Sequence, residues 1–398
     1  MTGSPVVGLI ILAVVRIAVN ELSLHAVQKP EVGVVTIPIS EAGLTGLSNL
    51  VDILDALSGK VCLITGDAGY TFFEGNQRVQ LYGVGYRPKP NTLDRLLRYT
   101  AMQLRISYRL ARVSAKTWIF FIGGPILLLP VLTARLLGKK VVLAWAGSVG
   151  ESVKAQSKIL YQPVQLFIKA SLVLSHRIVL YSQSLIQEHG LVKHTHKISI
   201  ATQHFIDFGK FKIDRPLSQR DALLGYIGRL SEEKGVLNLM ETIPGLLRMR
   251  PDIKLLIVGD GRLRSNVEEV LTHENLAGNV SLVGWVARDE VPEYLNELKL
   301  LVVPSYTEEL PNIMLEAMAC GTPVLATPVG AIPDVIKDEE TGFIMEDNSP
   351  ECISRNIIRA LNHPNLEEIA RNARAIVEKE FTYERALDGY RSVLDSLE

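Results

Sequence analysis

The segment Pro304–Val324, which reads PSYTEELPNIMLEAMACGTPV, constrains the fold of this chain more than any other part of the sequence. It follows Leu300–Val303, an apolar run with the length and composition of a buried parallel strand. The helical pattern that comes next is stopped by Gly321 and Pro323. The sequence therefore predicts a strand, a loop and a helix in succession, which is the repeating unit of a parallel α/β sheet.

Two carboxylates, Glu308 and Glu316, stand on either side of the start of this predicted helix. Glu308 falls in the loop and Glu316 about two turns into the helix, whose first amides, near Pro311, Asn312 and Ile313, can receive a phosphate. One carboxylate can then meet a sugar and the other a ribose. The alternative is that both glutamates are ordinary polar residues at a helix start.

A second strand and turn lie upstream, in Leu223–Gly235, which reads LLGYIGRLSEEKG. An apolar strand ends at Gly228 and leads into a loop that carries Arg229 and Lys234. Two fixed positive charges at such a turn suit a diphosphate, because they neutralise the charge that develops on a leaving group. The alternative is a solvated pair of cations beside two neighbouring glutamates.

Two further strand-and-turn segments separate these motifs. Lys254–Val270 contains a strand, a Gly-Asp-Gly turn at Gly259 and a charged helix, and Asn279–Trp285 is another strand that ends in glycine. Glycine turns of this kind occur throughout doubly wound folds, so Gly259 taken alone indicates only a tight corner.

Taken together and in this order, the four segments resemble the donor-binding half of the retaining glycosyltransferases of family 4 (glycosyl transferases group 1), where a Glu, seven residues and a second Glu grip a nucleotide sugar. The resemblance implies catalytic roles for Arg229, Lys234 and Glu308, with Glu316 on the ribose. It also implies donor-binding positions at Gly228, Gly259, Gly284, Trp285, Val286, Pro311, Asn312, Ile313 and Glu316.

The same resemblance implies an α/β chain of two Rossmann-like domains of the GT-B type, facing each other across a cleft. We expect an apolar segment at 1–25, an acceptor-side domain at 26–211, a donor domain at 212–380 and a closing helix at 381–398. Catalysis would retain the configuration of a UDP- or GDP-linked sugar without a cofactor. No Asp-x-Asp pair occurs in the strand-end loops, which argues against a metal.

The chain departs from the family pattern at three places. Thr45 stands beside Gly46 where two glycines are usual, and Ala146 stands where the family often has a His, which leaves Ser148 as a candidate on the acceptor side. Glu309 occupies a position where glycine is frequent. Four histidines between 189 and 204 fit no metal-binding pattern and are expected to be surface or hinge residues.

Length, cysteine content and charge place further limits on the chain. Its 398 residues suit two domains, and its three widely spaced cysteines indicate neither disulfides nor a metal site. Residues 1–210 hold 22 Lys and Arg against 11 Asp and Glu, which leaves 20 basic and 32 acidic residues for 211–398. A basic half in a nearly neutral chain suggests an anionic partner such as a phospholipid or a lipid diphosphate.

The basic charge is concentrated in Thr92–Lys116, a predicted amphipathic helix. Its cations share one face: Arg95, Arg98, Arg105, Arg109, Arg112 and Lys116. We expect this face either to lie on anionic lipid, where a lipid-linked acceptor would be found, or to be a solvated helix surface. Nucleic acid is a poorer fit, because no aromatic platform accompanies the arginines.

The apolar stretch Val6–Val19 is broken by Arg16 and is short for a membrane span. We expect an interfacial segment or a weak anchor, with a catalytic body in the cytoplasm, where nucleotide sugars are available.

Two alternatives to a transferase stay open: a nucleotide-sugar epimerase of the same architecture, and an inactive homologue. A nicotinamide-dependent oxidoreductase is disfavoured, because no GxGxxG turn is followed by a suitably spaced acidic residue.

Overall fold

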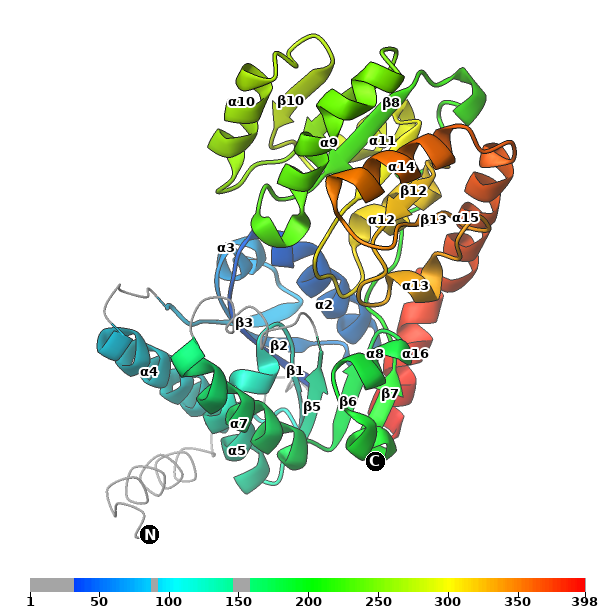
Figure 1. Cartoon of the computed structure of the whole chain (residues 1–398). Coiled ribbons are helices and arrows are strands. Elements are labelled where there is room, and N and C mark those ends of the chain that lie inside the picture. The colour runs from blue at the N-terminus through cyan, green and yellow to red at the C-terminus, as the bar shows by residue number, and fades with distance from the viewer. Residues whose placement is uncertain (1–31, 87–91, 146–157, 398) are drawn as a thin grey trace. The chain divides into compact units, whose positions relative to one another are not determined.

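A computed structural model describes residues 32–86, 92–145 and 158–397 (Figure 1). The chain divides into two compact units. The first comprises residues up to Ile186, Gly190–Gln203 and the C-terminal residues from Ala386, and the second comprises Gln187–His189 and His204–Arg385. Each unit is built on one parallel sheet, so the prediction of two Rossmann-like domains is confirmed.

The first unit contains a seven-stranded sheet in the order β3-β2-β1-β4-β5-β6-β7. The strands are β1 (Val32–Ile39), β2 (Val61–Asp67), β3 (Val79–Gly83), β4 (Thr117–Phe120), β5 (Lys140–Ala144), β6 (Arg177–Leu180) and β7 (Ile198–Ile200). Its helices are α2 (Leu44–Ser58), α3 (Ala68–Phe73), α4 (Thr92–Arg112), α5 (Leu128–Leu136) and α7 (Lys158–Leu174), and α8 (Ser184–Glu188) begins in this unit. The central strands are buried because helices cover both faces of a parallel sheet.

The second unit contains a six-stranded sheet in the order β10-β9-β8-β11-β12-β13. The strands are β8 (Leu223–Ile227), β9 (Lys254–Val258), β10 (Val280–Gly284), β11 (Leu300–Val303), β12 (Val324–Ala326) and β13 (Phe343–Ile344). The helices are α9 (Val236–Met249), α10 (Arg264–His273), α11 (Val291–Glu297), α12 (Asn312–Ala319), α13 (Ile332–Val335), α14 (Pro350–Leu361) and α15 (Leu366–Glu380). Helices α9 and α14 pack side by side over a core that includes Leu224, Ile257 and Leu300 (Figure 1).

The division between the units lies a few residues before the expected boundary of 211/212. His204 and Ile206 already belong to the second unit, because His204 bonds Asn312 and the Ile206 amide donates to the Phe381 carbonyl. The last helix, α16 (Tyr383–Asp395), returns to the first unit from Ala386 onward. There the Arg177 guanidinium donates to Ser396 Oγ at 2.8 Å.

The expected helix at 92–116 ends at Arg112, so Lys116 lies in the turn before β4. In the parts of the chain that the structure describes, no helix has both the length and the apolar character that crossing a membrane requires. The apolar stretch Val6–Val19 lies outside the described residues, as do Ala146 and Ser148.

Candidate active site

The candidate site lies at the carboxyl edge of the six-stranded sheet, where β8 pairs with β11. From β8 the chain runs outward through β9 to β10, and it then crosses back to β11 on the other side of β8. Ligands of doubly wound sheets bind at such a reversal, because the loops that follow the two strands diverge there. The loops after β8 and β11, together with α12, carry eight of the twelve catalytic and donor-binding residues predicted from the sequence.

These two loops are packed against each other. The Tyr306 amide donates to the Glu233 carbonyl at 2.9 Å. Gly235 has a φ of +67°, and a side chain there would collide with the Pro304 carbonyl oxygen. The glycine therefore allows the loop after β8 to pass close to the loop after β11, which places Lys234 next to Glu308.

Lys234 and Glu308 form an ion pair at the centre of the site. Lys234 Nζ lies 2.6 Å from Glu308 Oε1, and Ser305 Oγ donates to the same oxygen at 2.7 Å. Only 9% of the Glu308 side chain and 24% of the Lys234 side chain are exposed. The predicted phosphate-binding cation and the predicted sugar-binding carboxylate are therefore held in fixed positions beside each other.

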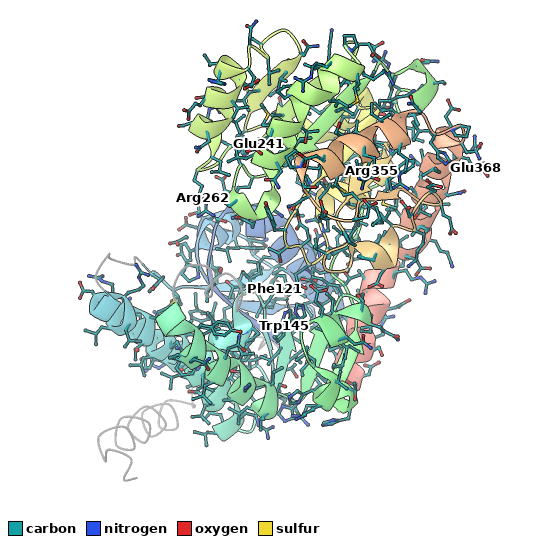
Figure 2. The ribbon with its side chains drawn as sticks, in the orientation of Figure 1. Phe121, Trp145, Glu241, Arg262, Arg355 and Glu368 are labelled. Atoms are coloured by element: carbon teal, nitrogen blue, oxygen red, sulfur yellow. The ribbon has the colours of Figure 1, made fainter. Side chains whose placement is uncertain are left out.

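Arg229 lies in the same loop but has a weaker partner. Its Nη2 atom is 3.6 Å from Glu233 Oε1, and half of its side chain is exposed. Arg262, which is labelled in Figure 2, also contacts Glu233. Burial alone would raise the pKa of Glu233, but a hydrogen bond from Ser231 and the two arginines lower it overall. Arg229 thus remains available to a ligand at the end of β8.

Glu316 is buried on α12 and is paired with a residue that the sequence analysis did not identify. Arg288, in the loop after β10, donates from Nη2 to Glu316 Oε1 at 2.7 Å. The Glu316 side chain is 3% exposed and the Arg288 side chain 48%. Burial raises the pKa of Glu316, and both the charge and the hydrogen bond of Arg288 oppose that shift.

The first amides of α12 point outward from the N-terminus of the helix. The N-cap residue is Pro311, whose side chain cannot accept a hydrogen bond, and no side chain that the structure describes caps this end. Asn312 Oδ1 lies 2.6 Å from His204 Nδ1. His204 is buried and is therefore not a surface residue, although it stands at the division between the two units, where a hinge residue is expected. Burial lowers its pKa to about 4. A neutral imidazole therefore holds the first residue of the helix.

The glycines at the ends of three adjacent strands form a close-packed row. The Gly228 amide donates to the Val258 carbonyl at 2.9 Å, and the Gly259 amide donates to the Gly284 carbonyl at 2.7 Å. Gly259 has a φ of +133°, and a side chain there would collide with the Gly228 carbonyl. After Gly284 the chain exposes 66% of Trp285. Val286 follows and is half-buried.

Residues 207–376 match the sequence model of the family described as glycosyl transferases group 1. The second unit is a glycosyl transferases group 1 domain. Relatives include the 2-deoxystreptamine glucosyltransferase of Streptomyces kanamyceticus, 30% identical over 36% of this chain and 37% of that protein. The N-acetyl-alpha-D-glucosaminyl L-malate synthase of Bacillus anthracis is 29% identical over 53% of this chain and 57% of that protein. The chain spans about half the length of the curated relatives that it matches.

Solved structures extend the likeness in fold to both units. HepE of Anabaena, solved in complex with UDP, aligns with a TM-score of 0.73 at 16% identity, over 92% of this chain and all of that one. Sucrose-phosphate synthase of Thermosynechococcus elongatus aligns with a TM-score of 0.71 at 18% identity, over 93% of this chain and 99% of that one. The predicted pair of Rossmann-like domains agrees with these neighbours.

Glu309, the departure from the usual glycine, lies beside the ion pair in the loop of the group 1 domain. Its side chain is 10% exposed, and Oε1 lies 3.2 Å from His189 Nε2. Both carboxylate oxygens are buried, and neither accepts a hydrogen bond from any residue in the described part of the chain. This pair could not be predicted from the sequence, because His189 and Glu309 are far apart in it.

A large groove on the domain is separate from this site. It has a volume of about 930 Å³ and lies between α9, α10 and α14, with Glu241 and Arg355 on its walls (Figure 2). None of the residues predicted for the site lines it. The site at β8 and β11 is therefore supported by its chemistry and by its place in the sheet, and not by the size of a cavity.

In the first unit, the structure places Gly46 in the first turn of α2. A side chain there would make only ordinary contacts, 3.5 Å from Phe121 and 3.6 Å from Gln203. Of the predicted lipid-facing residues on α4, Arg98, Arg105, Arg109 and Arg112 are exposed, and Arg95 is half-buried. Arg109 lies 5.5 Å from the centre of the Tyr82 ring and Arg112 4.6 Å from that of Tyr108.

Proposed function

We propose that this chain is a retaining, metal-independent glycosyltransferase that moves a sugar from a nucleotide sugar to an acceptor. The observation that carries the proposal is the buried pair of Lys234 and Glu308 at the β8/β11 reversal of a group 1 domain. A fixed cation and a fixed carboxylate at one point suit a donor with a diphosphate on one side and a sugar on the other. HepE, a neighbour in fold, is known in complex with UDP and with UDP-glucose.

Each residue of the site has a role in this mechanism. Arg229 and Lys234 neutralise the diphosphate, and the first amides of α12 complete its cradle. Glu316 accepts hydrogen bonds from the ribose, and Glu308 faces the transferred sugar. The bond between the anomeric carbon and the β-phosphate oxygen breaks, while the acceptor oxygen bonds to the same face of that carbon. The acceptor's proton passes to the departing diphosphate.

We further propose that the acceptor is linked to a lipid and that the protein works on the cytoplasmic face of a membrane. The exposed arginines of α4 stand next to exposed Leu96, Leu97 and Leu104 on the same helix. A basic face with apolar side chains suits an anionic lipid surface. Activity would then concentrate where a lipid-linked acceptor lies.

A panel of UDP, GDP, ADP and their sugar conjugates tests the proposal by thermal stabilisation, because a ligand that binds only the folded state raises the melting temperature. We expect one nucleotide to stabilise the protein and its sugar conjugate to serve as the donor. Incubation with the donor alone separates transfer from epimerisation, which needs no acceptor. Stabilisation by none of these compounds would instead favour an inactive homologue. The anomeric configuration of the product, read by NMR, tests retention.

A further inference from the structure

We propose that Arg288 is a positioning residue for nucleotide binding, which holds one oxygen of Glu316 so that the other oxygen can receive the ribose hydroxyls. This inference rests on the proposed function, because it assumes that a nucleotide binds at α12. It concerns a residue outside the motifs that define the site, on the loop after β10, 28 positions before Glu316 in the sequence.

The two oxygens of the Glu316 carboxylate have different surroundings. Oε1 accepts the hydrogen bond from Arg288 Nη2 at 2.7 Å. Oε2 accepts none from any residue that the structure describes, although the side chain is only 3% exposed. A carboxylate with one oxygen held by a cation and the other oxygen open is prepared for a hydroxyl donor, because an ionised carboxylate accepts hydrogen bonds at both oxygens.

Contacts with the segment that precedes β8 hold Arg288 in position. Its guanidinium carbon lies 5.8 Å from the centre of the Phe211 ring. The next residue, Asp289, pairs with Lys210 at 2.7 Å. These contacts tie the loop after β10 to the segment that precedes β8, so the guanidinium keeps one direction toward Glu316.

Arg288 also supplies the only positive charge that contacts this carboxylate among the described residues. Cys320, the C-cap residue of α12, is neutral because burial raises the pKa of its thiol to about 12. Arg220 and Arg374 bond the carbonyls of Cys320 and Ala319 at the far end of the helix and do not reach the carboxylate. A buried carboxyl without a cation tends to take up a proton, and a neutral carboxyl accepts hydrogen bonds more weakly.

The test measures the affinity of UDP-glucose by calorimetry from about pH 5 to about pH 8, a range where its diphosphate does not titrate. Arg288→Met removes the charge, and Arg288→Lys retains it. Arg250→Met is the matched control, because Arg250 pairs with Asp252 at the same 2.7 Å but that carboxylate is 53% exposed. If the stabilisation panel selects guanosine, GDP-mannose replaces UDP-glucose.

We expect Arg288→Met to bind about tenfold more weakly than wild type near pH 6 and to recover affinity as the pH rises, because Glu316 loses the interactions that keep it ionised. Arg288→Lys should keep most of the wild-type profile, and Arg250→Met all of it. If the Arg288→Met variant melts like wild type and binds UDP-glucose with the wild-type dependence on pH, that result overturns the inference, while the proposed function stands. If wild type binds no nucleotide sugar at any pH, both fail.

Discussion

The ion pair of Lys234 and Glu308 combines a functional and a structural role in two side chains. Lys234→Ala should lower transfer by at least about a hundredfold, because it removes a charge placed for the leaving group. It should also lower the free energy of unfolding by about 1–3 kcal/mol, because Glu308 stays buried without its cation. Urea unfolding and a transfer assay measure the two effects.

A second substitution separates the two roles. Adding Glu308→Gln to Lys234→Ala should recover most of the lost stability and none of the activity. Lys254→Ala, at the exposed start of β9, is the control and should change neither. Normal turnover of the Lys234→Ala protein would remove Lys234 from the catalytic assignment.

His204 makes the stability of the second unit depend on pH. Burial holds its pKa at about 4 in the folded protein, below its ordinary value of 6.5, so the unfolded chain binds a proton first as the pH falls. Stability should therefore decline between about pH 6.5 and about pH 4, by about 3 kcal/mol in total. His204→Gln should flatten this decline in urea unfolding, whereas His273→Gln, at an exposed position, should leave it unchanged.

At the scale of the element, the sequence was a good guide to strands with long apolar runs. The four strands predicted in the second unit are present as β8, β9, β10 and β11, and Leu300–Val303 is fully buried. In the first unit, the apolar runs at 32–38, 60–66, 117–124, 139–145 and 176–182 also predict strands, and they form β1, β2, β4, β5 and β6. Four strands were not predicted. Of these, β12 and β13 in the second sheet are only three and two residues long. The other two, β3 and β7, lie at the two edges of the first sheet, where a run is short or contains a polar residue such as Gln80. An edge strand buries less, so its pattern is weaker.

The motifs on β8, β11 and α12 could be predicted because each depends on neighbours in the sequence. Pairings between distant residues could not. Arg288 reaches Glu316 from another loop, His204 meets Asn312 across 108 positions, and Glu309 packs against His189. The helix at 92–116 was predicted four residues too long, because Lys139 bonds the carbonyls of Val113 and Ala115 where the chain leaves the helix.

The turn between β8 and α9 depends on glycine at one position. Gly235→Ala should cost at least about 2 kcal/mol, since it adds both a strained φ and a collision with the Pro304 carbonyl. Gly245→Ala, inside α9, meets only the end of the Arg248 side chain and should stabilise the protein by about 0.5–1 kcal/mol. If Gly235→Ala and Gly245→Ala changed the free energy of unfolding in urea equally, the loop after β8 would be able to move away from β11.

At the scale of the whole molecule, the contrast between a basic half and an acidic half is the property that bears on partners. Neutralising Arg98, Arg105 and Lys116 with Gln should weaken binding to phosphatidylserine vesicles by about 1 kcal/mol for each charge. The same change at Arg371, Lys379 and Arg385, which are equally exposed on α15 and α16, should have little effect. Equal losses for both triple variants would indicate attraction by net charge alone, and no binding by wild type would exclude a lipid surface.

The central claim is that a nucleotide sugar binds at the β8/β11 reversal of the group 1 domain, and hydrogen–deuterium exchange with the stabilising nucleotide tests it most directly. We expect slower exchange in peptides that cover residues 228–235, 284–288 and 304–316, because the ligand takes up their amides and fixes their loops. Peptides around the groove between α9, α10 and α14 should not change. Protection there, with none at the three strand-end segments, would contradict the account.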